Sequence, residues 1–441
     1  MRIALIPTLG LALALAGCHD LLDTNPTNQL PSDKAITTAA GARAALAGAY
    51  DGLQSLSYYG GDYLIFNDLY ADNAQHIGTS NSYADAGGRS ILADNGVVSS
   101  NWASIYVTIS RANNLIQKVP AVADLDETEK NEILGEAHFI RALCFHNLVK
   151  VWGDVPMPLI PPTTLDEASA ITRTPVADVY TQILDDLSQA ATLITNTDVI
   201  NHANVGAVHA LLARVYLYQA NYAAAGAEAD SVTALGYLLA TNYGDMFQPG
   251  SATTTEDIFN LSFTAIDYTN LGYYYISVDN GGAGEVAPSG NIDSAFTASD
   301  VRYAWDINTE TDPPEGIKWP TTFGTEWFRV FRYSEIVLIK AEVLARANQL
   351  GAAVDEYNLI RERAGLPDHV LGTDVTSQQD VLDAIDHERR LEMAFEGDRF
   401  PDLVRTGRAT TVLGIPAFRT LFPIPQSEID VAPGITQNTG Y

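Results

Sequence analysis

Residues 388–407 read ERRLEMAFEGDRFPDLVRTG and carry nine charged side chains in one short run that we predict to be helical. Opposite charges three or four positions apart share a helix face, so this run is expected to form a network of ion pairs. Residues 421–441, LFPIPQSEIDVAPGITQNTGY, contain prolines that exclude a continuous helix. We interpret the charged run as a structural, non-catalytic element that pins the C-terminal helices to the repeat helices further upstream.

Two segments further upstream repeat one spacing of small and large residues. The first consists of Ala213, Tyr216, Tyr222, Ala225, Ala229 and Val232, and the second of Ala341, Leu344, Leu350, Ala353, Tyr357 and Ile360. Small residues where two helices touch, and large ones where they fill the gap, are typical of a tetratricopeptide helix pair. We therefore predict such repeats near 203–236 and 331–364. Two repeats alone are too small to be stable, so other helices must pack on them.

Two other regions, 52–100 and 242–330, differ from this helical pattern. Both are rich in Gly, Asn, Ser or Thr and aromatic residues, and the second contains short alternating runs, DIFNLSFTAI and GYYYISV, that predict strands or hairpins. Long irregular insertions on a rigid scaffold commonly carry the binding site. The predicted fold class is mainly α: a tetratricopeptide-repeat helical scaffold with loop-rich, ligand-binding insertions and short β hairpins.

The N-terminus has the pattern of a lipoprotein signal peptide. An apolar run from Ile3 to Ala16 follows Arg2 and ends in LAGC, with Cys18 directly after small residues. The run is too short to span a bilayer but suits a secretory signal. We predict a signal peptide over residues 1–17 and lipidation of Cys18; the alternative is an ordinary signal peptide with a chance cysteine. Cys144 then has no disulfide partner, and its apolar surroundings predict a buried thiol.

The charged run, the Pro-rich C-terminus, LAGC and the following HDLLDTNPTNQLPSD together resemble the SusD/RagB family of outer-membrane glycan-binding lipoproteins. The resemblance implies one SusD-like domain over 18–441, anchored by lipid at the surface of the cell outer membrane. It implies non-covalent binding of an oligosaccharide, delivery to a TonB-dependent outer-membrane transporter, and no cofactor. Some members of the family bind peptides, and the sequence leaves that open.

Composition and the absence of catalytic motifs reduce the number of possible functions further. The formal net charge is −29, so the surface repels nucleic acid and anionic lipid. The sequence contains no GxSxG, HExxH, CxxC, P-loop or GxGxxG motif, which favours a protein that is not an enzyme. Abundant carboxylates do not identify a glycosidase pair. His138 and His146 lie two turns apart on a predicted helix without other ligands nearby, so we predict no metal site there.

Aromatic residues in the insertions are the main candidates for ligand contact, because sugar C–H faces pack on aromatic rings. They are Tyr58, Tyr59, Tyr63 and Tyr83 in the first insertion and Tyr273, Tyr274, Tyr275, Trp305 and Trp319 in the second. In a strand Tyr274 would face away from its two neighbours. We select Tyr274, Trp305 and Trp319 as glycan-binding residues, whereas Trp102 and Trp152 are assigned to the core.

Two short segments add further candidates. LYADNAQHIG at 69–78 resembles a family segment that faces the sugar, which implies that Asp72 and Asn73 contact the ligand; the end of a helix is the structural alternative. DINTETD at 306–312 alternates oxygen-bearing side chains, which leaves a calcium ion open, although an exposed acidic loop is favoured.

Two other classes of function remain as alternatives. One is a tetratricopeptide scaffold lipoprotein that binds protein or peptide partners at the outer membrane. The other is a secreted glycosidase, which the missing catalytic motifs disfavour. The aromatic insertions and the C-terminal signature favour glycan binding over both.

Overall fold

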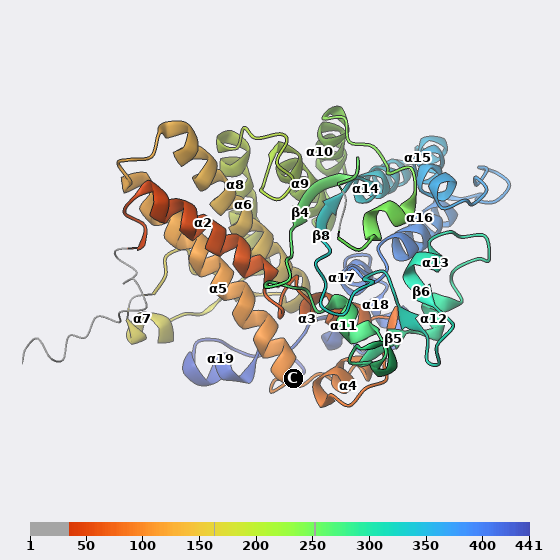
Figure 1. Ribbon diagram of the computed structural model, residues 1–441, viewed down its shortest axis with the longest axis horizontal. Coiled ribbons are helices and arrows are strands. Elements are labelled where there is room, and N and C mark those ends of the chain that lie inside the picture. Colours follow the sequence, from red (N-terminus) through yellow and green to blue (C-terminus); the bar gives the residue numbers. More distant parts are fainter. Residues whose placement is uncertain (1–34, 163, 251–252) are drawn as a thin grey trace, which may run out of the picture.

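The computed structural model describes residues 35–162, 164–250 and 253–441. The predicted signal peptide and Cys18 therefore lie outside the described residues. The longer helices are α2 (Ala39–Gln54), α5 (Gly96–Lys118), α6 (Glu127–Trp152), α8 (Val176–Leu193), α9 (Val205–Tyr218), α10 (Tyr222–Ala234), α14 (Tyr333–Arg346), α15 (Leu350–Arg363) and α16 (Gln378–Glu392). Each of these helices packs on the next, and Figure 1 shows the series running from α2 at one end to α16 at the other.

The predicted repeats are confirmed as two helix pairs, α9 with α10 and α14 with α15, which pack on each other through α10 and α14. The small residues Ala213, Ala225, Ala341 and Ala353 are completely buried where the helices meet. Asn221 lies in the first turn between helices, where its side-chain oxygen accepts a hydrogen bond from the Ala224 N–H and caps α10. The scaffold is therefore built from the local pattern that the sequence predicts.

Short helices and strands fill the insertions and the C-terminus. The helices are α3 (Asp62–Tyr70), α4 (Asn81–Gly87), α7 (Leu165–Ser169), α11 (Leu271–Tyr275), α12 (Gly290–Asp293), α13 (Tyr303–Asp306), α17 (Arg399–Arg405), α18 (Ala409–Leu413) and α19 (Gln426–Val431). Single turns of 3-10 helix occur at η1 (Val119–Ala121), η2 (Tyr243–Phe247), η3 (Val278–Asn280) and η4 (Ala417–Thr420). The strands are β1 (Ala74–His76), β2 (Val155–Pro156), β3 (Arg173–Thr174), β4 (Asp257–Leu261), β5 (Val286–Pro288), β6 (Ile307–Asn308), β7 (Glu315–Gly316) and β8 (Phe328–Arg332).

The strands of the described chain form two-stranded antiparallel sheets: β1 with β5, β2 with β3, β4 with β8, and β6 with β7. Two of these pairs join the second insertion to distant parts of the molecule. The β4–β8 pair ties the beginning of the insertion to the strand that leads into α14, and the β1–β5 pair ties it to the first insertion. The two insertions consequently form one side of the molecule beneath the repeat helices (Figure 1).

One secondary-structure prediction in the insertion is wrong. The run DIFNL forms strand β4 as expected, but the run at 271–275 is the short helix α11 and not a strand. The alternation expected for its tyrosines therefore does not apply. Tyr273 and Tyr274 are both half-buried at the surface, and only Tyr275 turns inward.

The charged run is not one helix either. Helix α16 ends at Glu392, and the chain turns before α17 starts at Arg399. Phe395 and Gly397 have positive φ values of 61° and 74°, which no continuous helix allows. A Cβ atom on Gly397 would lie 2.8 Å from the Cα of Leu64 in α3, so glycine permits this close approach.

The charged residues do form ion pairs, but the prediction that they pair along one helix face is wrong, because most of their partners lie outside the run. Arg389 with Asp398 and Arg405 with Asp402 pair within it, at 2.7 and 2.6 Å. The pairs that reach other elements include Arg399 with Asp72, Arg405 with Glu342, Glu396 with Lys318, Glu388 with Arg302, and Glu392 with Arg332 and Arg363. We call this set the C-terminal ion-pair network. It joins α16 and α17 to α3, α14 and the second insertion, as expected of a structural element.

The Pro-rich C-terminal tail packs against the C-terminal end of α6, and α19 is its only regular helix. The Phe422 N–H donates to the Val151 carbonyl, and the Asn438 amide donates to the Trp152 carbonyl. Trp152 and Trp102 are fully buried, as predicted. Cys144 is a buried free thiol, also as predicted. No helix in the described ranges has both the length and the apolar character that a membrane crossing requires.

Candidate functional site

Four aromatic rings form a contiguous cluster at the surface of the second insertion. The rings of Tyr273 and Phe323 stack at 5.3 Å and 22°, and Tyr268 meets Phe323 edge-on at 5.1 Å. Tyr274 adjoins Tyr273 at 5.6 Å. Phe323 is 55% exposed, and the three tyrosines are half-buried. We call Tyr268, Tyr273, Tyr274 and Phe323 the aromatic face.

Close backbone approach holds the aromatic face together. A Cβ on Gly272 would lie 2.0 Å from the Thr321 carbonyl oxygen, so glycine lets α11 lie directly against the loop that carries Phe323. Thr269 and Gly324 exchange both backbone hydrogen bonds across the two segments, at 2.9 and 3.0 Å. The cluster is thereby preorganised, because the hydrogen bonds fix both segments before any ligand binds.

The base of the aromatic face is anchored to the first insertion. The Asn270 N–H donates to the Gly60 carbonyl at 2.8 Å. Behind Tyr274 lies Tyr83, with ring centroids 5.2 Å apart, and the Tyr83 hydroxyl donates to Asp62 at 2.6 Å. Burial is the main reason that the pKa of Asp62 is raised, and burial together with Asp62 raises the pKa of Tyr274 to about 12. Tyr274 is therefore uncharged at neutral pH.

Trp305 lies on another part of the insertion. It is half-buried in α13, and its indole lies against the backbone of Gly244, where a Cβ would come within 2.0 Å of the ring. Among the described residues no ring contact joins Trp305 to the aromatic face. The structure therefore brings Tyr274, but not Trp305, into the cluster.

Trp319, which the sequence predicts to contact the glycan, lies in the core. Only 2% of this residue is exposed, and its ring packs against Phe247 and Phe328 in the hydrophobic core. Its indole N–H donates to the Phe395 carbonyl at 3.1 Å. A ring covered on both sides cannot stack on a sugar, so Trp319 fastens the insertion to the turn after α16.

Asp72 and Asn73 are also interior residues, 7% and 0% exposed. Arg399 donates to Asp72 at 2.9 Å, and Arg390 donates to the Asn73 side-chain oxygen at 2.9 Å. The Asn73 amide donates in turn to Asp68 at 3.1 Å. These contacts contradict a role in binding a surface ligand: both residues belong to the connection between α3 and the C-terminal ion-pair network, as the helix-end alternative implies.

The tyrosines of the first insertion are buried as well, with Tyr58, Tyr59, Tyr63 and Tyr83 between 0% and 4% exposed. Local composition alone does not distinguish a tyrosine that packs a loop onto a helix from one that faces solvent. Phe323 and Tyr268 carry the same sequence signal, an aromatic residue in a Gly- and Thr-rich loop, and the sequence alone does not single them out. The tyrosines of the first insertion differ from Phe323 and Tyr268 because distant segments of the chain cover them.

The segment 306–312 does not present its oxygen atoms to a common point. Asp306 is completely buried, accepts a hydrogen bond from the Tyr243 hydroxyl at 2.9 Å and lies 4.0 Å from Lys318. Its pKa is raised to about 7, mainly by burial. Within the described residues no cluster of three or more His, Cys, Asp or Glu side chains is arranged to hold a metal ion. His138 pairs with Asp186 at 2.7 Å instead.

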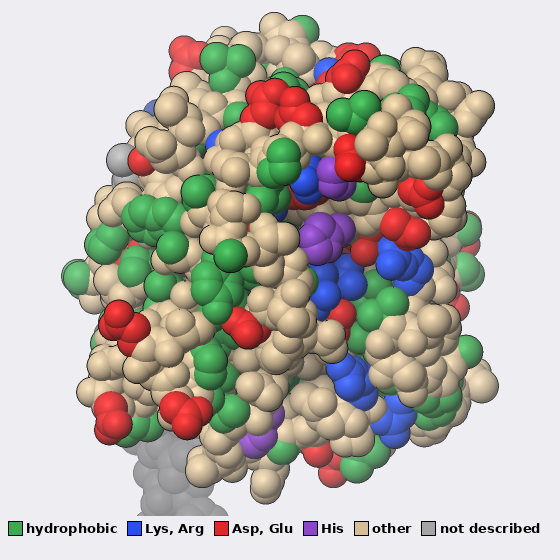
Figure 2. Space-filling view, turned by 90° about the vertical axis from the view of Figure 1, so that its right-hand side faces the viewer, with side chains coloured by type: hydrophobic (Ala, Val, Ile, Leu, Met, Phe, Trp, Pro, Cys, Tyr) green, Lys and Arg blue, Asp and Glu red, His purple; other side chains and the backbone are tan. Residues whose placement is uncertain are grey.

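The exposed charge is unevenly distributed. On the side of the molecule where α15 and α16 lie, Lys and Arg side chains gather in one zone, while Asp and Glu side chains are scattered around it (Figure 2). The four side chains of the aromatic face are uncharged at neutral pH. A neutral ligand with apolar faces suits that surface better than an ionic one.

The fold and site define a class of protein: a tetratricopeptide-type helical scaffold that carries a preorganised aromatic surface on irregular insertions. Family models agree at both ends of the chain: residues 280–417 match the model of the SusD family, and residues 20–217 match one described as "starch-binding associating with outer membrane". The chain belongs to the SusD family.

Relatives extend the match over nearly the whole chain. SusD-like protein P2 of Formosa agariphila is 27% identical over 92% of this chain and 90% of its own length. A SusD superfamily protein of Bacteroides thetaiotaomicron superposes with a TM-score of 0.80 at 25% identity, over 91% of this chain and 99% of its own. A laminarin-binding SusD-like protein superposes with a TM-score of 0.81 at 24% identity, over 92% of this chain and its entire length. These similarities confirm the predicted fold.

Proposed function

We propose that this protein binds a neutral oligosaccharide non-covalently on the aromatic face. The observation that carries the proposal is the stacked pair of Tyr273 and Phe323, which is open to solvent and extended on both sides by Tyr268 and Tyr274. Sugar rings pack their C–H faces on such rings, and a contiguous run of rings offers room for more than one sugar residue. Trp305 is a separate, second proposed contact.

The similar proteins support this choice of ligand. One family model that matches this chain is described as starch-binding, and two proteins with the same fold are described as laminarin-binding and as a surface glycan-binding protein of Bacteroides fluxus. Starch and laminarin are both neutral glucans. A neutral ligand also agrees with the net charge of −29, which disfavours acidic polysaccharides.

Calorimetric titration with neutral glycans, beginning with laminarin and starch oligosaccharides, tests the proposal. Phe323→Ala and Tyr273→Ala are expected to abolish measurable binding, because micromolar affinity amounts to only about −8 kcal/mol and a central ring supplies a large share of it. Phe418→Ala is the matched control: Phe418 is a half-buried ring that pairs with Tyr441, away from the insertion. A folded Phe323→Ala protein that binds as tightly as wild type would place the site elsewhere.

Two further outcomes distinguish the alternatives. If peptides bind and no glycan does, the protein belongs with the peptide-binding members or the scaffold proteins. If a bound oligosaccharide is hydrolysed on long incubation, and replacement of one Asp or Glu stops the hydrolysis, the protein is a glycosidase. We expect unchanged oligosaccharide.

We further propose that acyl chains on Cys18 anchor the protein at the outer-membrane surface, where it passes the oligosaccharide to a TonB-dependent transporter. Support comes from LAGC at residues 15–18 and from the family description, which places such proteins at the outer membrane. Several acyl chains on one residue suffice for stable anchoring. Mass spectrometry of the mature N-terminus from the native host tests the anchor, and an unmodified Cys18 would exclude it. Co-purification from native outer membranes tests the transporter.

A further inference from the structure

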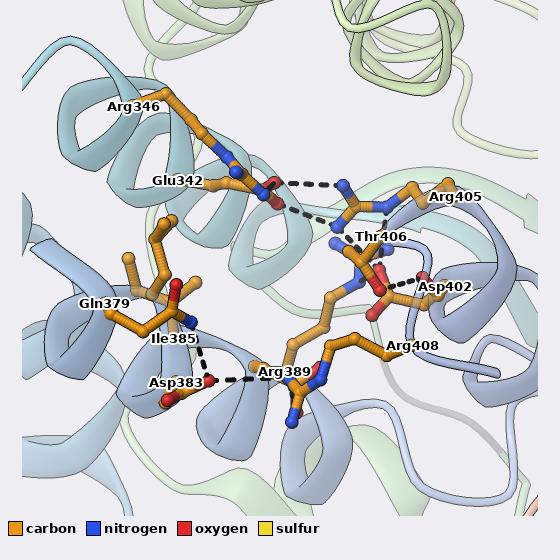
Figure 3. A pocket seen from close by; sticks show the side chains of 12 residues that line it. Glu342, Arg346, Gln379, Asp383, Ile385, Arg389, Asp402, Arg405, Thr406 and Arg408 are labelled. Atoms are coloured by element: carbon orange, nitrogen blue, oxygen red, sulfur yellow. Dashed lines mark hydrogen bonds and ion pairs between the residues drawn. The ribbon is translucent and has the colours of Figure 1, made fainter. Parts of the chain in front are cut away.

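A hollow lies between α14, α16 and α17, outside the insertions. Its volume is about 240 Å³. Figure 3 shows Glu342 and Arg346 of α14 on one side, Asp383 and Arg389 of α16 below, and Asp402, Arg405 and Thr406 at the end of α17 opposite. The hollow opens to solvent beside exposed Gln379 and Arg408, whose side chain is 37% exposed. We call it the α14–α16–α17 pocket.

The deep wall of this pocket is rigid. Arg405 donates to Glu342 at 2.7 and 3.0 Å and to Asp402 at 2.8 Å, so one guanidinium joins α14 to α17. Arg405 holds the pKa of Glu342 down at about 2, against the opposing effect of burial. The pair is therefore charged at neutral pH and holds α14 against α17.

One deeply placed polar atom remains available inside this rigid wall. Asp402 is 3% exposed, and its contacts with Arg405 and Arg389 converge on Oδ1. Among the described residues no hydrogen bond ends on Oδ2. This oxygen can therefore accept a hydrogen bond from a donor that enters the pocket.

Hydrogen-bond donors lie at the rim. Arg346 reaches Glu342 through Nη2 at 3.2 Å, and Arg408 reaches Asp386 through Nη1 at 2.8 Å, so each guanidinium has further N–H groups to offer. The Gln379 amide donates to Asp383, which leaves its carbonyl oxygen facing the opening as an acceptor. Leu382 and Ile385 supply an apolar side wall.

The charges decide which chemistry fits. The positive and negative charges that line the pocket cancel at neutral pH. The four arginines are Arg346, Arg389, Arg405 and Arg408, and the four carboxylates are Glu342, Asp383, Asp386 and Asp402. An anion would have to approach the free Asp402 oxygen, and a cation would have to approach the arginines. The hydroxyl groups of a neutral ligand can donate hydrogen bonds to the carboxylates and accept them from the arginines. The C–H face of such a ligand can pack on Leu382.

We propose that the α14–α16–α17 pocket is a second binding site, which takes a single neutral sugar ring or a polyol of similar size. It is independent of the aromatic face: no residue of the two sites is shared, and the failure of either proposal leaves the other standing. A ring held here would lie on the repeat scaffold, where it bridges α14 to α17.

Saturation-transfer-difference NMR with glucose, galactose, mannose and xylose tests this site. The experiment is run in the Phe323→Ala protein, so that the aromatic face does not contribute. At least one sugar is expected to give a signal, and adding Leu382→Trp should weaken its affinity by about tenfold or more because the indole fills the pocket. Leu359→Trp is the matched control on the neighbouring α15, where the residue is 42% exposed and lies outside the pocket.

Thermal unfolding verifies that each variant is folded. If Leu382→Trp does not fold, Gln379→Trp at the exposed rim of the pocket repeats the test. The proposal is overturned if no sugar gives a signal in the Phe323→Ala protein, which means that water alone fills the pocket. It is equally overturned if Leu382→Trp or Gln379→Trp leaves the signal unchanged. Displacement of the sugar by inorganic phosphate would instead identify an anion site at the arginines.

Discussion

Asp72, two residues after α3, and Arg399, at the start of α17, are 327 positions apart in the sequence and are joined by a 2.9 Å hydrogen bond between buried side chains. Arg390 approaches the other Asp72 oxygen at 3.1 Å. The two arginines hold the pKa of Asp72 below its usual value although burial opposes them. This carboxylate is therefore a fixed charge that locks the first insertion to the C-terminal run.

Replacing Arg399 by Ala should destabilise the protein by about 3 kcal/mol, because a partner carboxylate is left buried with one arginine in place of two. Chemical denaturation measures the change. Arg43→Ala is the matched control, since it removes the same charge from a pair with Glu129 in which the Arg43 side chain is 60% exposed, and it should change stability far less. Glycan affinity of the folded Arg399→Ala protein should be unchanged. Lost binding with normal stability would show that this region is a ligand site.

Gly397→Ala should also destabilise the fold, and by more than an ordinary helix substitution. The new Cβ would meet the backbone of Leu64 at 2.8 Å, and the residue would be held at a φ of +74°. Gly351→Ala is the control: its Cβ would meet no atom within 4 Å, and alanine favours the helix by about 0.5–1 kcal/mol. Calorimetric melting should move in opposite directions for the two variants, and parallel shifts would contradict the argument.

Lys150, near the end of α6, should make stability depend on pH. Burial, assisted by repulsion from Arg214, lowers its pKa from 10.5 to about 7, and its ammonium lies 5.7 Å from the Tyr63 ring centroid. Between these two pH values the unfolded chain binds more protons than the folded one, so the contribution of Lys150 to stability rises with pH.

Lys150→Met should accordingly be more stable than wild type at pH 7, and the difference should shrink as the pH approaches 10. Denaturation of both proteins at several pH values in this window measures the trend. Only the difference between them is informative, because other groups titrate equally in both. A difference independent of pH would mean that Lys150 keeps its ordinary pKa in the folded state.

Trp319 and Phe323 should respond to truncation in opposite ways, although they are four positions apart on the same loop. Trp319→Ala removes a core ring and the hydrogen bond to Phe395, and should cost about 3–5 kcal/mol of stability. Phe323→Ala should leave the melting temperature nearly unchanged and remove glycan binding. Melting and calorimetric titration of both variants measure the contrast, and binding that is lost in a stable Trp319→Ala protein would restore Trp319 as a ligand residue.

Binding at the aromatic face should be insensitive to salt. Contacts between rings and sugar carry no net charge, so screening of the −29 surface does not affect them. Titration with one glycan at low and high NaCl measures this. Affinity that falls steeply with salt would indicate that charged groups, and not the rings, supply most of the binding energy.

The sequence by itself determined the helical scaffold, both repeat pairs and the structural role of the charged run. Helix periodicity and the spacing of Ala213, Ala225, Ala341 and Ala353 are local properties, and each small residue lies where its own neighbours in the chain put it. The family also followed from short, contiguous motifs. The break at Phe395 and Gly397 was missed because it depends on α3, which supplies the close contact from far away in the chain.

Only the tertiary structure decided which aromatic rings are exposed. Trp319 and Phe323 occupy the same kind of Gly- and Thr-rich loop. Phe247, Phe328 and the turn at Phe395 cover Trp319, whereas Phe323 remains 55% exposed in the part of the chain that the structure describes. Apolar rings gain from burial wherever a distant segment reaches them, and that segment cannot be read from neighbouring residues. The same reason placed Asp72 and Asn73 inside the molecule: their arginine partners come from the other end of the chain.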